Sequence, residues 1–94
     1  MSLEDQYKLY VEAYYGIQSI DEYDLKEYVL NEIKQLMINF ENNYKGIDYN
    51  YINEYVKYNV DNKTKLQSSL ILLNEINGSI ELILLIKKKI KKYN

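Results

Sequence analysis

Residues 69–89 read SLILLNEINGSIELILLIKKK, and this stretch decides the fold of the 94-residue chain. Two apolar runs flank Asn77-Gly78, a pair that is typical of the two-residue turn of a β-hairpin. Both faces of such a ribbon would be largely apolar here, and a lone two-stranded ribbon of that kind needs cover on both sides. The stretch is also rich in Leu, with Glu and Lys interleaved, which favours helix over strand.

Residues 69–89 could form any of three structures. We favour two helices that meet at Gly78, which would end the first in the left-handed conformation while Ser79 caps the second. The hairpin is the second alternative. A single helix through Gly78 is the third, because one glycine costs a helix only about 1 kcal/mol. A transmembrane helix is excluded, since it needs about 20 consecutive apolar residues and residues 82–86 are the longest unbroken run here.

A first helix is expected over residues 3–15. Ser2 precedes it, and Asp5 follows three residues later, an arrangement that resembles a capping box. Apolar side chains then recur at helical spacing, with charged residues on the other side. Gly16 offers the left-handed conformation at which many helices end.

A second, longer helix is expected over residues 22–44. Asp21 can cap it, and Ile20 and Leu25 have the spacing of a hydrophobic staple. The longest apolar stripe of the chain follows, and Gly46 closes it. A helix of this length would extend for about 34 Å. We therefore expect it to organise the domain.

The same pattern of an acidic cap before an apolar stripe repeats twice more. Asp48 can cap a third helix that fades near Asn59, and Asp61 can cap a fourth. Together the segments predict an all-α fold, a small antiparallel bundle of four to five helices. Residues 1–94 form one domain, with a basic helix end at residues 87–94.

The composition argues against an enzyme. The chain has no Cys and no His, so it lacks the usual thiolate nucleophile, the commonest general base and the commonest metal ligand. Acidic side chains crowd residues 21–27, but the start of a helix favours acids for electrostatic reasons alone. We expect no catalytic residue, no cofactor and no metal site. An enzyme that uses only carboxylates and tyrosines is the least favoured alternative.

Charge is divided unevenly along the chain. Residues 1–86 carry seven Lys against fourteen Asp and Glu, whereas residues 87–94 carry five Lys and no acid. An acidic body disfavours nucleic acid as the principal ligand. All basic residues are Lys, and Asn, Ile and Tyr are abundant, which indicates a low-GC genome such as that of a mobile element. The N-terminus lacks the pattern of a signal peptide, so a cytoplasmic location is expected.

Two surfaces are candidates for contact with a partner. The last helix is apolar almost all round over its first turns, so it is either central in the bundle or shared with a partner. The lysines that follow either solvate a helix end or contact an anionic membrane surface or an acidic protein. Three tyrosines share a rim suited to protein contact. The candidate residues are Leu82, Leu85, Ile86, Lys87, Lys88, Lys89, Ile90, Lys92, Tyr51, Tyr55 and Tyr58.

Residues 13–58 resemble the immunity proteins of pediocin-like bacteriocins. The likeness lies in AYYGIQSIDEYDLKEYVLNEI leading into NYKGIDYNYINEYVKY, where helix, turn and an INxxV stretch fall in similar order. The resemblance implies a soluble four-helix bundle that protects a bacteriocin producer from inside the cell. It also implies action at the toxin-occupied membrane receptor, with specificity in the C-terminal half.

A non-enzymatic binding protein is therefore expected, with immunity to a bacteriocin or toxin as the leading role. Its partner would be the toxin, a receptor or a host protein. The alternative is a phage- or plasmid-encoded regulator or inhibitor that acts through protein contact, as a homodimer formed by the last two helices. Peripheral membrane contact through the lysine tail is compatible with either role.

Overall fold

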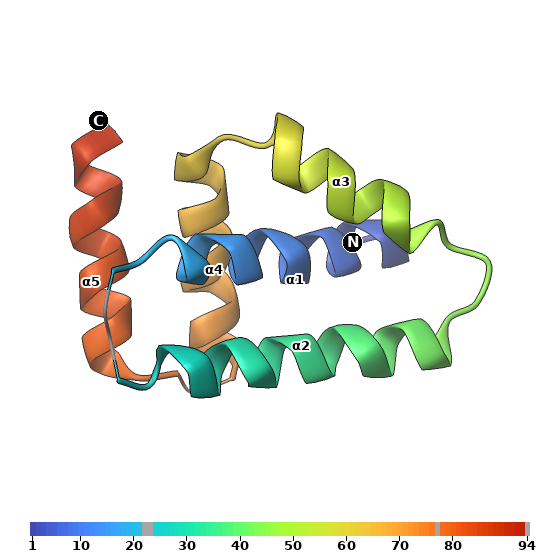
Figure 1. Cartoon of the computed structure of the whole chain (residues 1–94), viewed down its shortest axis with the longest axis horizontal. Coiled ribbons are helices and arrows are strands. Elements are labelled where there is room, and N and C mark those ends of the chain that lie inside the picture. Colours follow the sequence, from blue (N-terminus) through green and yellow to red (C-terminus); the bar gives the residue numbers. More distant parts are fainter. Residues whose placement is uncertain (22–23, 77, 94) are drawn as a thin grey trace.

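The computed structural model of the chain describes residues 1–21, 24–76 and 78–93. These residues form α1 (Leu3–Gln18), α2 (Lys26–Asn43), α3 (Tyr49–Asn59), α4 (Asn62–Glu75), α5 (Ile80–Ile90) and a short 3₁₀-helix, η1 (Lys91–Tyr93) (Figure 1). The small all-α bundle is confirmed. The described residues contain no strand, so the hairpin alternative is wrong, as is the single continuous helix. No helix in this part of the chain has the length and apolarity to cross a membrane.

Helix α1 is the centre of the arrangement. It packs on α2, α3 and α4, and α5 packs on α4. Figure 1 shows α2 antiparallel to α1, α4 crossing α1, and α5 antiparallel to α4. The expectation that residues 22–44 organise the domain is therefore wrong. The apolar stripe of that segment is also buried only over its middle, because Leu25 and Tyr44 at its two ends are 49% and 42% exposed.

The expected helix starts at Ser2, Asp48, Asp61 and Ser79 are confirmed. In each case the side-chain oxygen accepts a hydrogen bond from the backbone N–H three residues later, which satisfies one of the unpaired donors of the first turn. The bonds run from the N–H of Asp5 to Ser2 (3.1 Å), of Tyr51 to Asp48 (3.0 Å), of Thr64 to Asp61 (2.7 Å) and of Leu82 to Ser79 (3.4 Å).

Gly16 does not end α1, contrary to expectation. The helix continues to Gln18, and Gly16 is a buried residue at the crossing with α4. A β-carbon at this position would overlap the Ser69 hydroxyl and lie 2.8 Å from the carbonyl carbon of Lys65. The Ser69 hydroxyl lies 3.0 Å from the Ala13 carbonyl and 2.8 Å from the Lys65 carbonyl, so it joins the two backbones. Glycine is required because α4 approaches α1 this closely.

The start of α2 was placed too early by the sequence. Helix α1 runs on to Gln18, and α2 begins only at Lys26. Leu25 occupies the cap position without a side-chain hydrogen bond, and Asp21 is exposed and does not cap. Ile20 is buried in the main core rather than stapled to Leu25. The part of this expectation that concerns residue 22 lies outside the described residues.

The turn between α4 and α5 ends α4 near Gly78, as expected, but for a different reason. The Gly78 N–H donates to the Leu73 carbonyl (2.7 Å), a bond of the kind that closes a helix C-terminus. A β-carbon on Gly78 would overlap the Leu73 side chain, whereas the positive φ lies at Gly46 (88°), after α2. Close packing against Leu73 is what requires glycine at position 78. Asn77 lies outside the described residues.

Two groups of buried side chains meet along α1. An aliphatic group fills the space between α1, α2, α4 and α5, and an aromatic group joins α1, α2 and α3. The aliphatic core comprises Ala13, Ile17, Ile20, Val29, Leu30, Ile33, Leu66, Leu72, Leu73, Leu82 and Ile86, and the aromatic core comprises Tyr7, Val11, Phe40 and Val56.

The Tyr7 hydroxyl connects three helices at the aromatic core. It donates a hydrogen bond to the Glu41 carboxylate of α2 (2.7 Å) and accepts one from the Asn53 side-chain amide of α3 (3.1 Å). The Tyr7 ring is fully buried and packs on Phe40 and Tyr49, with centroid separations of 5.7 and 4.6 Å. Burial of this hydroxyl, together with the bond to Glu41, raises the pKa of Tyr7 well above its usual value. A neutral, hydrogen-bonded phenol is thus the form that the fold selects.

Tyr7→Phe should lower the free energy of unfolding by about 1–2 kcal/mol at neutral pH, since it removes a hydrogen bond to a charged partner. The raised pKa gives a further signature. The contribution of the Tyr7 hydroxyl to stability is complete below the pKa of an unfolded tyrosine. It is lost as the pH rises toward the pKa of Tyr7 in the folded protein. Urea unfolding at neutral pH and above pH ~10 should therefore show a smaller alkaline loss of stability in the variant. Tyr58→Phe, at an exposed ring, should match the wild type, and equal alkaline losses in all three proteins would contradict the expectation.

Gly16→Ala should destabilise the protein. Alanine normally stabilises a helix by about 1 kcal/mol relative to glycine, but here its methyl group meets a backbone carbonyl and the bonded Ser69 hydroxyl. Overpacking of this kind costs about 1–3 kcal/mol, and the obstructing carbonyl belongs to the backbone of α4 rather than to a flexible side chain. The urea midpoint should fall. An unchanged or higher midpoint would show that α4 can move away from α1.

Candidate binding surfaces

One side of helix α5 is buried, and it includes some of the residues predicted for partner contact. Leu82 and Ile86 are fully buried in the aliphatic core. Ile90 and Lys89 are half-buried, with Ile90 packed against the same core. Leu82 and Ile86 therefore hold the helix in the bundle, and neither side chain is exposed to a partner in this structure. The apolar residues alone could not show which side is buried, because the first turns of the helix are apolar on nearly every side.

The opposite side of α5 is open, and we call its exposed residues the C-terminal face. Leu85, Lys87, Lys88 and Lys92 were predicted as contacts and lie there. Ile80, Leu84 and Lys91 were missed. The sequence did contain the information needed to find them. Residues three or four apart share one face of a helix, so counting back from the exposed lysines leads to the exposed apolar positions. The C-terminal face comprises Ile80, Glu81, Leu84, Leu85, Lys87, Lys88, Lys91 and Lys92.

Lys89 differs from the other lysines of the tail. Its ammonium group donates a hydrogen bond to the Ser19 carbonyl at the end of α1 (2.5 Å). Lys26 of α2 does the same for the carbonyls of Ile20 (2.9 Å) and Gln18 (3.4 Å). Helix α1 has no basic residue in its own last turn, so two lysines from other helices meet the negative end of its dipole. Lys89 is a structural lysine.

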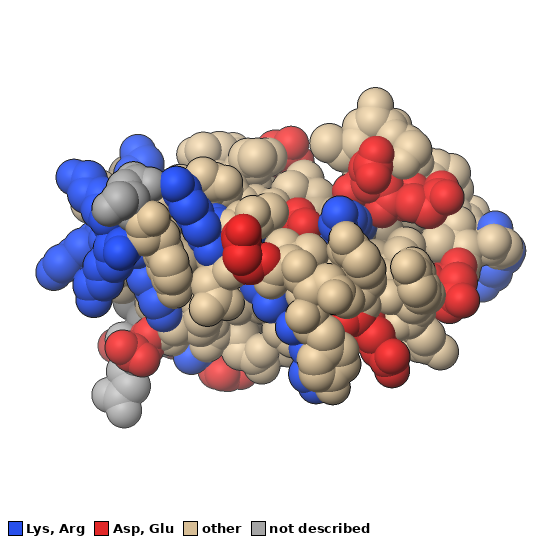
Figure 2. Space-filling view, turned by 90° about the horizontal axis from the view of Figure 1, so that it is seen from above, with Lys and Arg blue, Asp and Glu red and all other residues tan. Residues whose placement is uncertain are grey.

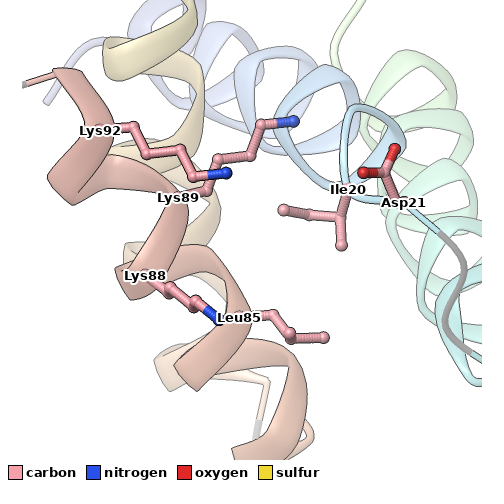
Figure 3. A pocket seen from close by; sticks show the side chains of 6 residues that line it. All are labelled: Ile20, Asp21, Leu85, Lys88, Lys89 and Lys92. Atoms are coloured by element: carbon pink, nitrogen blue, oxygen red, sulfur yellow. The ribbon is translucent and has the colours of Figure 1, made fainter.

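A hollow of about 250 Å³ lies beside the C-terminal face. Figure 3 shows the side chains of Leu85, Lys88 and Lys92 reaching it from the C-terminal segment, with Ile20 and Asp21 on the connection after α1. Its surface thus combines aliphatic carbon with lysine ammonium groups and one carboxylate. In Figure 2 the lysines gather at this end of the molecule, while most acidic side chains lie farther along it.

Three tyrosines on α3 form a second exposed surface, the aromatic stripe. Tyr51, Tyr55 and Tyr58 are 64%, 40% and 73% exposed and follow one another at helical spacing. The rings of Tyr51 and Tyr55 lie 6.2 Å apart. The Lys8 ammonium group lies 5.2 Å from the centre of the Tyr55 ring, and that of Lys57 lies 5.4 Å from the centre of the Tyr58 ring. The structure leaves all three predicted tyrosines uncovered.

Shallow hollows flank the aromatic stripe on both sides. One is lined by Tyr51 and Tyr55 together with Ile52 of the same helix and Glu4, Asp5 and Lys8 of α1. The other lies between Tyr15 of α1 and Tyr58, with polar side chains of α3 around it. Rings, amides and charges of both signs are therefore available to a partner along the whole stripe.

No group of three or more acidic side chains is placed to hold a metal ion in the described part of the chain. Of the acidic cluster at residues 21–27, Asp21 lies in the lysine-lined hollow. No family model, curated protein or solved structure matches this chain. Function must therefore be argued from the two surfaces themselves.

Lys89→Met should lower the free energy of unfolding by about 1 kcal/mol, because it keeps an apolar stem but removes the charge that caps α1. Lys88→Met, one residue away on the C-terminal face, is the matched control and should stay within about 0.5 kcal/mol of the wild type. Urea unfolding at low salt measures both. Equal effects of the two substitutions would show that Lys89 has no special role.

Proposed function

We propose that this chain is a non-enzymatic binding protein that protects a bacteriocin-producing cell from inside, and that it holds a protein partner through the aromatic stripe. The observation that carries the proposal is the stripe itself, three tyrosines that the fold leaves uncovered side by side. Tyrosine offers a large apolar ring and a hydroxyl that can bond at the same time. Protein interfaces are enriched in it, and it is prominent among the residues that dominate binding energy.

The position of the stripe supports a role in immunity. The three tyrosines lie within residues 13–58, the segment that resembles the pediocin-like immunity proteins. The stripe projects from a helix that the Tyr7 hydroxyl ties to α1 and α2 through Asn53 and Glu41. A surface on a fixed helix loses little conformational freedom when a partner binds. A chain of this size can therefore bind through a few rigid aromatic side chains.

The proposal is tested by survival. A sensitive bacterial host that expresses the chain is challenged with a panel of pediocin-like and other narrow-spectrum bacteriocins. Against at least one of them the inhibitory concentration should rise. Tyr51→Ala should reduce that protection by roughly tenfold or more, as expected for an interface residue worth about 1.4 kcal/mol or more.

Tyr28→Ala on α2 is the matched control, because Tyr28 is 65% exposed against 64% for Tyr51. It should leave protection unchanged. Circular dichroism and urea midpoints confirm that both variants fold. Sensitivity to every toxin in the panel would count against the immunity role. Equal loss of protection in the two variants would count against the aromatic stripe as the contact.

A further inference from the structure

The C-terminal face divides along the helix axis into an apolar half and a basic half. Ile80 and Leu84 are 75% and 58% exposed, values unusual for such large aliphatic side chains. Lysines occupy the same side from residue 87 onward. Glu81 is the one acid of the face and lies at the end away from the lysines. Uncovered hydrocarbon and concentrated positive charge therefore share one continuous surface.

We propose that the C-terminal face docks on an anionic lipid bilayer. Helix α5 would lie along the surface, with its lysine ammonium groups among the lipid phosphates and Ile80 and Leu84 at the boundary with the acyl chains. Lysine suits this position because its long apolar stem can lie against hydrocarbon while the charge stays at the headgroups. The face is already exposed, so docking requires no rearrangement of the core.

Charge complementarity gives the docking a direction. Residues 1–86 are acidic, with seven Lys against fourteen Asp and Glu, whereas residues 87–94 carry five Lys and no acid. An anionic surface repels the body of the molecule and attracts the lysine-rich end seen in Figure 2. Each lysine held close to such a surface strengthens binding roughly fivefold. The chain therefore approaches with α5 foremost.

The residue types of the face favour lipid over protein as the occupant. Protein interfaces are depleted in Lys, and their strongest contacts come from Trp, Tyr and Arg. Helix α5 has none of these three and consists of Ile, Leu, Lys and one Glu. Lysine forms a hydrated point charge without the two-pronged geometry of arginine. A point charge is sufficient to bind the phosphates of a fluid bilayer, because these groups are not held in a fixed arrangement.

The hollow beside the face is secondary to this docking. Asp21 lines it together with Lys88 and Lys92, and its carboxylate weakens the positive potential there. Lys87 and Lys91, which do not line the hollow, therefore supply most of the attraction to the lipid phosphates. This surface is separate from the aromatic stripe, so lipid docking goes beyond the proposed protein contact and does not depend on it.

Co-flotation of the purified chain with lipid vesicles tests the docking. The protein should float with vesicles that contain phosphatidylglycerol and not with vesicles of phosphatidylcholine alone, and added salt should weaken the binding. Lys87→Glu/Lys91→Glu should weaken binding to the phosphatidylglycerol vesicles by at least about tenfold. Leu84→Ser, which leaves the charge unchanged, should also weaken it.

Lys34→Glu/Lys45→Glu is the matched control, since it changes the net charge by the same amount at exposed positions on α2 and the loop after it. It should bind as the wild type does. Equal loss in both double variants would reduce the effect to net charge and overturn the docking face, as would wild-type binding by Lys87→Glu/Lys91→Glu. A dimer in light scattering that Leu84→Ser converts to a monomer would place a second copy on the face and overturn the proposal. Survival in the toxin assay does not enter either result.

Discussion

The close contact between Gly16 of α1 and the Lys65–Ser69 segment of α4 is the constraint on which the rest of this structure depends. Without a side chain at position 16, the backbone of α4 can approach until the Ser69 hydroxyl reaches the Ala13 carbonyl. That approach sets how α4 crosses α1. Helix α5 packs on α4, so the place of α5 at one end of the molecule follows from the same contact.

A different kind of junction positions the other surface. Around Tyr7 the contacts between α1, α2 and α3 are aromatic and polar, whereas those between α1, α4 and α5 are mainly aliphatic. The hydroxyl of Tyr7 must be satisfied by Glu41 and Asn53 together, which fixes α3 relative to both other helices. Helix α1 therefore carries two units that are held by separate interactions. Each unit presents one of the two exposed surfaces.

The sequence predicts what is local and misses what depends on distant partners. Ser79 and Asp61 reveal helix starts because a capping side chain and the backbone N–H that donates to it lie three residues apart. Gly16 was misread because a glycine that ends a helix and one that admits another backbone look the same, and its partner Ser69 is far along the chain. The start of α2 was misplaced for a separate reason, because Asp21 has the residue type of a helix cap but lies several residues before the helix begins.

The candidate site shows the same division. That the last helix would leave a surface open could be predicted from its composition, and the exposed tyrosines of α3 from their spacing. Which side of α5 is buried could not be predicted from its apolar residues alone, because Leu82 and Leu84 differ only in whether the fold covers them. The lysines held the missing information, since charged side chains mark the row that stays in solvent.

One lysine of the tail helps to fix the orientation of the exposed side of α5. Lys89 bonds the Ser19 carbonyl at the end of α1, while Leu82 and Ile86 lie in the core. These contacts fix the rotation of α5 about its own axis, so the C-terminal face is formed before any partner arrives. In the docking that we propose, such a preformed face loses little entropy, so its affinity depends mainly on its composition. Neighbouring lysines thus have different roles. Lys89 anchors α5 to the end of α1, and this anchor keeps the lysines of the C-terminal face exposed to solvent.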